Sequence, residues 1–401
     1  MKYLIYIGLL FLFACEMHEI PQTYDIDITV YYPDTLFNAA PLSNATIEIV
    51  NKQTGRKYSQ LSDGKGNVHF EVRGGLYDIN VSSMQNYLLE IDGDSEYKDL
   101  IFNETVFDKK ILTATHLNIH TTLTILNTGF VISELYNSGC RTPEGKLYYR
   151  DLFIEIYNNS DVTLFADGLC FGNLWYKNTY TPNPLLKPDG SFPPSIACWS
   201  YIAVIPGSGS DYPVNPGETF VIALSAINHR DDPNGNINSI DLSKSDFELF
   251  IEDGKYVDNP GVLNANMIQI HERPFSKVMV FNVKGQSSII FKIPDNNFQA
   301  FFGDPENYVF PPRSSDRCIL VPESWIIDGV ENPELNPTVY QRLPNNIDSG
   351  YIQHKGTGER VSIKRKIQKV VDGRVVLMDT NNSSNDFLTN QEPTPGVIES
   401  E

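Results

Sequence analysis

Short segments in which polar and apolar residues alternate dominate the first part of the chain. Asp25–Val30, Ala45–Val50 and Val68–Val72 are three such segments. An alternation with a period of two is typical of a strand that buries one face. Turn-forming residues, such as the glycines and asparagine of 63–67, separate these segments, and short strands spaced by turns indicate a β-sandwich. We therefore predict a β-sandwich over 24–115.

The pattern changes to longer and more apolar strands in the rest of the chain, 116–401. Thr128–Tyr136, Asp151–Asn158, Phe220–Leu224 and Ser288–Ile293 are near-continuous apolar runs bounded by turn residues. Such runs are typical of strands buried in a core, and helical periodicity is nearly absent. The pattern thus predicts an all-β protein in which a second, larger β-domain follows the first and carries long irregular connections.

The first residues follow neither pattern and resemble an export signal. Residues 1–14 hold one early lysine and a short apolar run, and Cys15 follows directly. The run is too short to span a bilayer as a permanent helix. The tetrapeptide Leu-Phe-Ala-Cys at 12–15 resembles a bacterial lipobox, which implies a lipid on Cys15. We expect a signal peptide over 1–14 and a polar tether over 15–23; the alternative is a simple signal peptide with an unrelated cysteine.

Part of the predicted N-terminal sandwich resembles a known spacer domain. Leu61–Phe70 followed by Gly75–Ile79 is similar to the transthyretin-like repeat called the carboxypeptidase regulatory-like domain. That resemblance covers about fifty residues. It implies a transthyretin- or immunoglobulin-like sandwich that acts as a structural spacer and brings no catalytic residues.

Two separated stretches resemble a second domain type. VISELYNSG at 131–139 and FIEIYNNSDVTL at 153–164 look like the opening of a lamin-tail domain, and 375–382 with the PTPG at 393–396 looks like its close. This implies a lamin-tail-like β-sandwich with long insertions. The whole arrangement is also similar to an uncharacterised family of Bacteroidota surface lipoproteins, domain of unknown function 4876, a resemblance that implies no activity.

The net charge of the chain makes some classes of binding partner unfavourable. Its 401 residues carry a formal net charge of −19, and the only dense basic cluster is 364–366. Long-range repulsion makes nucleic acid an unfavourable partner and anionic lipid surfaces unfavourable contacts. We therefore expect no nucleic-acid partner, and we expect contact with the membrane through the N-terminal lipid.

One segment, 170–201, gathers aromatic residues and prolines beyond what a connection needs. Rigid aromatic side chains offer large contact areas with few rotatable bonds, which suits docking of a partner or stacking of a sugar. The alternative is that they anchor the loop to its own domain. The candidate recognition residues are Trp175, Tyr176, Tyr180, Trp199 and Tyr201.

Four cysteines remain after Cys15, and an exported chain could join them in pairs. Four cysteines allow three pairings. Cys170 and Cys198 bracket the aromatic segment, so they are the first candidate disulfide. The alternative is that they are free buried thiols, which large domains commonly hold.

Two loops alternate oxygen-bearing side chains in a way reminiscent of calcium loops, although neither has the glycine placement and terminal glutamate of an EF-hand. Clusters of Asn, Asp and Gly also form ordinary turns. Calcium is the only candidate cofactor. Its candidate ligands are Asp231, Asp232, Asn234 and Asn236 in one loop, and Asp379, Asn381 and Asp386 in the other.

The sequence contains one candidate pair of catalytic carboxylates. Glu134 and Glu155 each stand inside an apolar strand, where an unpaired carboxylate is costly. Their similar placement in the lamin-tail-like segments is better explained by the fold. His116 and His120 share a strand face without an evident third metal ligand, and no nucleophile elbow or phosphate loop occurs. We expect a protein that is not an enzyme and assign no catalytic residue.

The sequence as a whole favours a lipid-anchored binding or accessory module of the outer membrane, on the cell surface. Its expected partner is a protein or a glycan, and one concrete version is an accessory of a nutrient transporter. Two alternatives stay open: a surface hydrolase that uses strand carboxylates or calcium, and a structural or adhesive surface protein.

Overall fold

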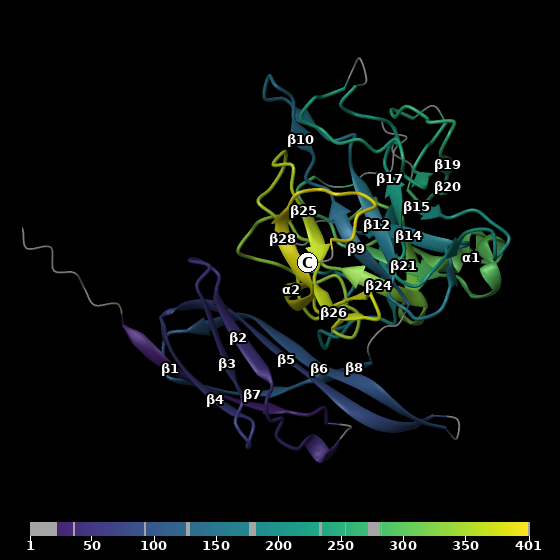
Figure 1. Cartoon of the computed structure of the whole chain (residues 1–401). Coiled ribbons are helices and arrows are strands. Elements are labelled where there is room, and N and C mark those ends of the chain that lie inside the picture. The colour runs from purple at the N-terminus through teal and green to yellow at the C-terminus, as the bar shows by residue number, and fades with distance from the viewer. Residues whose placement is uncertain are drawn as a thin grey trace, which may run out of the picture.

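The protein consists of a smaller N-terminal β-sandwich and a larger C-terminal β-structure (Figure 1). The computed structural model describes residues 22–34, 37–91, 94–125, 129–175, 182–231, 235–252, 254–271, 281 and 283–399. Almost all regular elements in these ranges are strands, which confirms the predicted all-β class. No helix in these ranges is long and apolar enough to cross a membrane.

Two sheets build the N-terminal sandwich. One has the strand order β4-β1-β7 and the other β3-β2-β5-β6-β8. Every second residue of β1 points inward, so Ile26, Ile28 and Val30 are buried beside Val68, Phe70 and Val72 of β4. The strands are β1 (Thr23–Tyr31), β2 (Thr46–Asn51), β3 (Lys57–Leu61), β4 (Asn67–Arg73), β5 (Gly75–Ile91), β6 (Asp94–Ile111), β7 (Thr115–His120) and β8 (Thr122–Ile125), with a short 3-10 turn η1 (Phe37–Ala39).

The N-terminal sheets continue past the predicted end of this domain at 115. Strand β7 pairs in parallel with β1, and β8 pairs with β6. Strand β5 is also much longer than its alternating segment predicted, because it forms a long hairpin with β6. Residues 116–125 therefore belong structurally to the N-terminal sandwich.

The C-terminal part contains two larger sheets. Among the described residues their strand orders are β19-β18-β17-β12-β9-β25-β28 and β22-β23-β15-β14-β21-β24, and β20 pairs with β15 in the second sheet. The first sheet holds β9 (Phe130–Tyr136), β12 (Phe153–Asn158), β17 (Thr219–Ala223), β18 (Phe247–Glu248), β19 (Leu263–Asn264), β25 (Ser362–Arg365) and β28 (Phe387–Gln391). The second holds β14 (Leu169–Leu174), β15 (Ser195–Val204), β20 (Asn266–Gln269), β21 (Ser288–Lys292), β22 (Tyr308–Val309), β23 (Cys318–Pro322) and β24 (Ile326–Val330).

Short elements complete the C-terminal part. Within the described ranges, the two-stranded pairs are β10 (Cys140–Arg141) with β11 (Leu147–Tyr148), β13 (Leu164–Phe165) with β16 (Pro213–Val214), and β26 (Ile367–Val371) with β27 (Arg374–Leu377). The helical elements are η2 (Pro294–Asn296), α1 (Phe298–Gly303), η3 (Pro305–Asn307), η4 (Glu323–Trp325) and α2 (Ser383–Asp386).

The second sheet is buried on both faces. Leu169 and Phe171 of β14 contribute to the main core shared with the first sheet. Cys170 and Leu174, which alternate with them, contribute to a separate core on the other side, together with Phe301 of α1. This two-sided burial explains why the strands of this region read as continuous apolar runs rather than alternating ones.

The first and last strands of the C-terminal part lie in one sheet. Strand β25 pairs with β9 on one side and with β28 on the other. The opening strand β9 and the last strand β28 are thus brought into one sheet across the long intervening chain. The predicted closing segment lies outside that sheet, and its residues 375–377 belong to the β26–β27 hairpin. The lamin-tail and regulatory-like assignments remain predictions.

A buried polar contact joins the two parts. The Asn103 side chain in β6 donates to the carbonyl of Thr380, and the Asn382 amide donates to Thr105 Oγ1 at 3.2 Å. The Tyr351 hydroxyl donates to Asp78 at 2.5 Å. Asn103 and Asn382 are both fully buried. Because buried polar groups need their partners, these bonds favour one fixed arrangement of the two parts.

Candidate functional site

Two of the three predicted recognition residues that the structure describes are buried within the protein. Trp175 is only 6% exposed, and its indole N–H donates to Asp316 Oδ2 at 3.1 Å. Tyr201 is 4% exposed and belongs to the main core. Tyr176 and Tyr180 lie outside the described residues. The prediction of a recognition surface is therefore wrong at Trp175 and Tyr201. Leu185 of the described part of the loop packs in the same cluster as Trp175, whereas Tyr201 is part of β15 and lies in the main core.

Trp199 is the one described member of that set with a partly exposed ring. It packs with Trp175, Ala197 and Cys318 in a small cluster beneath the loop. Its ring also lies 6.5 Å, centroid to centroid, from the His271 imidazole. Trp199 thus remains a candidate contact residue.

The predicted Cys170–Cys198 disulfide is not formed; both residues are free buried thiols, as are Cys140 and Cys318. In the strand register Cys170 faces Val204, whereas Cys198 faces Leu174. The two cysteines are therefore four positions apart along β14, roughly 13 Å at the usual rise of a strand. A disulfide needs Cα atoms within about 7 Å of each other, so this sheet cannot form the bond.

The first predicted calcium loop is only partly described, because Asp232 and Asn234 lie outside the described residues. Asn236 is buried and its amide donates to the Arg141 carbonyl at 3.0 Å. Asp231 is exposed and accepts from Asn228 at 2.7 Å. The described side chains therefore bind neighbouring protein groups and do not converge on a common point.

The second predicted calcium loop surrounds an arginine. The Arg365 guanidinium lies 3.0 Å from Asp379, 3.6 Å from Asp386 and 2.5 Å from Asp328, and all four residues are buried. Burial alone would lower the pKa of Arg365, but the three carboxylates outweigh it and raise that pKa. Asn381 donates instead to the Asn346 carbonyl. Arg365 provides the positive charge here, which corrects the calcium interpretation of this loop.

The two candidate catalytic glutamates accept hydrogen bonds from backbone amides near the end of the chain. Glu134 and Glu155 face each other on β9 and β12 and are buried. Glu155 accepts from the Gly396 amide at 2.6 Å, and Glu134 accepts from the Thr394 amide at 3.3 Å. The segment around Pro395 thus covers both carboxylates. This contact explains their placement in apolar strands by structure and weakens the hydrolase alternative.

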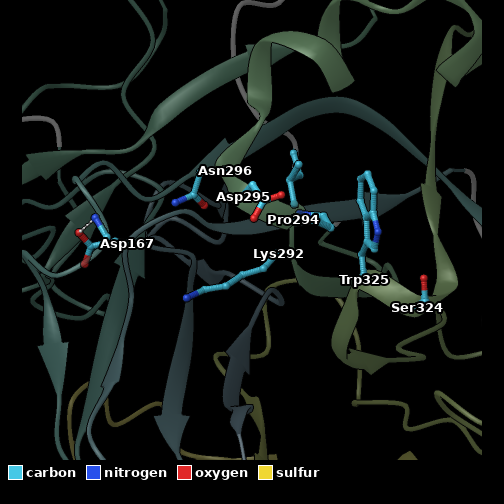
Figure 2. Close-up of a pocket in the computed structure, with 9 residues that line it drawn as sticks. Asp167, Lys292, Pro294, Asp295, Asn296, Ser324 and Trp325 are labelled. Carbon is cyan, nitrogen blue, oxygen red and sulfur yellow. Dashed lines mark hydrogen bonds between the residues drawn. The ribbon is translucent and has the colours of Figure 1, made fainter.

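A hollow of about 450 Å³ lies where β21 ends, and it was not predicted (Figure 2). It combines an indole ring, an ammonium group, carboxylates, an amide and a hydroxyl. The residues that line it are Asp167, Gly209, Lys292, Ile293, Pro294, Asp295, Asn296, Ser324 and Trp325. They come from four separate stretches of the chain: the connection before β14, the connection after β15, the end of β21 with the turn that follows it, and η4.

Asp167 forms a rigid, charged wall of this hollow. Its carboxylate accepts three backbone N–H groups, from Gly209, Asp211 and Tyr212, each at 2.9 Å. Burial acts to raise the pKa of Asp167, but these three donors outweigh it and hold the pKa below its usual value. Gly207 has a φ of +127°, and a Cβ there would lie 2.2 Å from Asp167 Oδ1, so only glycine fits.

Lys292 is the only lysine or arginine among the lining residues. Its ammonium donates to the Phe165 carbonyl at 2.9 Å, which fixes the side chain at the floor of the hollow. In Figure 2 it points toward Asp167. Burial lowers the pKa of Lys292, and the charge of Asp167 opposes that shift. One backbone bond leaves capacity for further hydrogen bonds, because an ammonium carries three donors.

The turn after β21 is tightly constrained. Asp295 and Asn296 have φ values of +55° and +51°, a left-handed conformation that Asp and Asn tolerate better than most residues. Gly168 makes room for this turn, since a Cβ on it would lie 2.4 Å from Asn296 Oδ1. Both turn side chains are exposed at the hollow. Strain of this kind gathers at binding sites, where the surrounding structure maintains it.

Trp325 is the aromatic wall. Its ring is partly buried and packs edge-on against Phe301 of α1, with the ring centroids 5.0 Å apart. Figure 2 shows the ring beside Pro294, across the hollow from Asp167. A ring fixed in this way can stack against a flat apolar face of a ligand without losing rotamer freedom.

A second hollow of about 520 Å³ shares Lys292 with the first. Its other lining residues are mainly apolar, with one amide: Gly129, Phe130, Leu164, Phe165, Ile326, Ile327 and Asn381. We call the two hollows together the Lys292 groove. A site with apolar walls and a few fixed polar groups is typical of small-molecule binding.

No local pattern in the sequence predicts this groove. Its residues are single polar or aromatic positions in otherwise ordinary turns, and no local spacing connects them. The available signals were the Pro-Asp-Asn-Asn turn at 294–297 directly after an apolar strand, and Trp325, the tryptophan outside the aromatic segment. Only the pairing of β14 with β21 and of β21 with β24 brings them together.

Comparison with known proteins supports the family resemblance but assigns no activity. Residues 215–394 match the protein family of unknown function DUF4876. The crystal structure of a DUF4876 family protein from Bacteroides thetaiotaomicron VPI-5482 is similar over 92% of this chain and 96% of that one, with 24% identity and a TM-score of 0.61. This confirms the predicted resemblance to that family and shows a shared fold.

Other similarities are too weak to support an argument. A candidate adhesin from Bacteroides ovatus ATCC 8483 is 8% identical over 82% of this chain and 91% of that one, with a TM-score of 0.17. The Bacillus anthracis TIE protein is 12% identical over 50% of this chain and 28% of that one, with a TM-score of 0.18. No curated protein matches the chain.

Proposed function

We propose that this chain, whose residues 215–394 match the DUF4876 family, is a lipid-anchored surface protein that binds a glycan in the Lys292 groove. The observation that carries this proposal is the juxtaposition of Trp325 with Lys292, Asp295 and Asn296 around one hollow. Sugars present flat apolar faces edged by hydroxyl groups. An indole ring beside fixed donors and acceptors complements both features.

The polar groups of the groove suit a neutral sugar. Lys292 and Asn296 can donate hydrogen bonds to hydroxyl oxygens, and Asp295 can accept from hydroxyl groups. The two carboxylates at the first hollow outnumber its single ammonium, so a strongly anionic ligand would meet net repulsion. Ligand hydroxyls also replace water without leaving a buried charge unpaired.

The surface location belongs to the same proposal. The lipobox-like segment at 12–15 supports a lipid on Cys15, which lies outside the described residues. The N-terminal sandwich then serves as the spacer between the lipid and the groove. A glycan-binding lipoprotein on the outer membrane would suit service as an accessory of a nutrient transporter. Loss of lipid labelling in a Cys15→Ala variant would support the anchor, and retained labelling would contradict it.

A panel of immobilised neutral and acidic glycans tests the ligand class. Wild-type protein without its signal peptide should retain a subset of neutral glycans. The Lys292→Met variant should lose most of that retention, because Met keeps the side-chain length but removes all donors. Thermal melts of both proteins control for folding. Retention that Lys292→Met leaves unchanged would contradict the proposal, and so would a panel on which nothing binds.

A further inference from the structure

The two hollows of the Lys292 groove share walls that run continuously from one to the other. On one side Ser324 and Trp325 line the first hollow, and the next two residues, Ile326 and Ile327, line the second. This wall is η4 passing directly into β24. It therefore has no chain break or side element between the hollows.

The opposite wall is also formed by one continuous stretch of chain, but this stretch passes the second hollow before the first. Leu164 and Phe165 of β13 line the second hollow, and Asp167, two residues later, lines the first. The Phe165 carbonyl accepts from Lys292 Nζ at 2.9 Å, so this wall is tied to the floor at the junction. Two walls and a shared floor residue define one elongated groove rather than two separate cavities.

Lys292 stands at the junction and is the lining residue common to both hollows. Each hollow, at about 450 and 520 Å³, is by itself within the range of small-molecule sites. The first offers an indole face and several polar side chains. The second offers the Phe165 ring and aliphatic walls together with the Asn381 amide. Each can therefore receive a sugar ring on an apolar surface with a polar group at its edge.

We propose that the hollows are consecutive subsites, so that the groove selects a linear oligosaccharide over a monosaccharide, with Lys292 donating to oxygens near the linkage between two sugars. This inference rests on the proposed glycan function and specifies its ligand. A monosaccharide fills one hollow only. A chain of two or more units covers both hollows and the ammonium between them, and gains the contacts of both without paying twice for lost translational freedom.

Calorimetric titration with chain-length series tests this directly. The probes are manno-, cello-, xylo- and β-1,3-gluco-oligosaccharides of one to six units. The protein should bind one series with an affinity that rises at least about tenfold between one and three units and then levels off. Equal affinity for the monomer and the longer chains would overturn the inference while leaving a Trp325-dependent glycan site intact. Absence of binding to every series would overturn the inference and count against the proposed function as well.

A variant that narrows only the second hollow provides an independent check. Leu164→Trp adds bulk to the second hollow and leaves the first unchanged. It should reduce the affinity for the trimer to that for the monomer, with monomer binding unaltered. Thermal unfolding reports whether the variant folds; if it does not, the chain-length series on the wild-type protein still decides. Undiminished trimer binding by a folded Leu164→Trp protein would contradict two consecutive subsites.

Discussion

One cluster of buried charges in the C-terminal part surrounds Arg365. Arg365 faces Asp328, Asp379 and Asp386, and burial together with mutual repulsion raises the pKa of Asp328 and Asp386, although Arg365 opposes this. A cluster of this kind adds little net stability as a whole, because desolvation offsets attraction. It is nevertheless sensitive to the loss of its single cation.

Replacing Arg365 with Met should strongly destabilise the protein. The change leaves three buried carboxylates without a positive partner, and the loss of one member of a buried pair typically costs about 3–5 kcal/mol. Urea denaturation at pH 8 measures the free energy of unfolding. Arg230→Met, which alters an exposed arginine, is the matched control. A loss below about 1 kcal/mol for Arg365→Met would show that the cluster is not structural.

Glu134 should make stability depend on pH. Burial raises the pKa of Glu134 from 4.5 to about 8, although Lys364 opposes the shift. The folded state therefore binds the proton more tightly than the unfolded state. The stabilisation is complete below pH 4.5 and is lost as the pH rises to about 8.

Glu134→Gln should remove that part of the dependence. Melting temperatures between pH 5 and pH 9 should fall less steeply for Glu134→Gln than for wild type, and the variant should be the more stable protein at pH 9, by as much as a few kcal/mol. The exposed Glu252→Gln serves as the control. Parallel curves for Glu134→Gln and wild type would contradict a proton held on Glu134.

Most strands that have a clear alternating or apolar pattern could be located from the sequence. The alternating segments became β1, β2 and β4, and the apolar runs became β9, β12, β17 and β21. The pattern failed where pairing partners are distant. The length of β5 follows from its hairpin with β6, and the place of β7 follows from β1, nearly ninety residues earlier.

The candidate binding residues also depend on contacts between distant parts of the chain. Aromatic richness in 170–201 was visible in the sequence, but whether a tryptophan points outward depends on which surface the loop covers. Trp175 is buried in a small cluster that includes Leu185 of the loop, and Tyr201 is buried because its face of β15 is part of the main core. The Lys292 groove, in contrast, joins residues spread between Gly129 and Asn381 that share no local pattern. Its prediction needs the register of the second sheet.

Two fragments of the N-terminal sandwich can test whether residues 116–125 belong to it. Its core lies entirely within 26–119 and includes Ile119 of β7, which is 3% exposed. A fragment of residues 22–125 should unfold cooperatively. A fragment of residues 22–115 loses β7 and β8, exposes the edge of β1, and should show no cooperative transition. Circular dichroism during urea titration distinguishes them; similar transitions for both fragments would contradict the assignment of 116–125 to this sandwich.

At the scale of the molecule, two β-structures are held in one arrangement by buried hydrogen bonds. Asn103, Thr105 and Asp78 of the N-terminal sandwich bind residues 349–382 of the C-terminal part. The direction of the Lys292 groove is thus fixed relative to the N-terminal sandwich. Under the proposed function, the sandwich would act as the spacer between a lipid on Cys15 and the groove.

Ligand binding in the groove, and not at the aromatic segment, can be tested by calorimetry with the glycan best retained by the wild-type protein, comparing Trp325→Ala with Trp199→Ala. If the ligand stacks on Trp325, Trp325→Ala should weaken binding by about 2 kcal/mol or more, while Trp199→Ala should bind as the wild type does. Normal binding by a folded Trp325→Ala protein, with binding lost in Trp199→Ala, would show instead that the ligand binds at the aromatic segment.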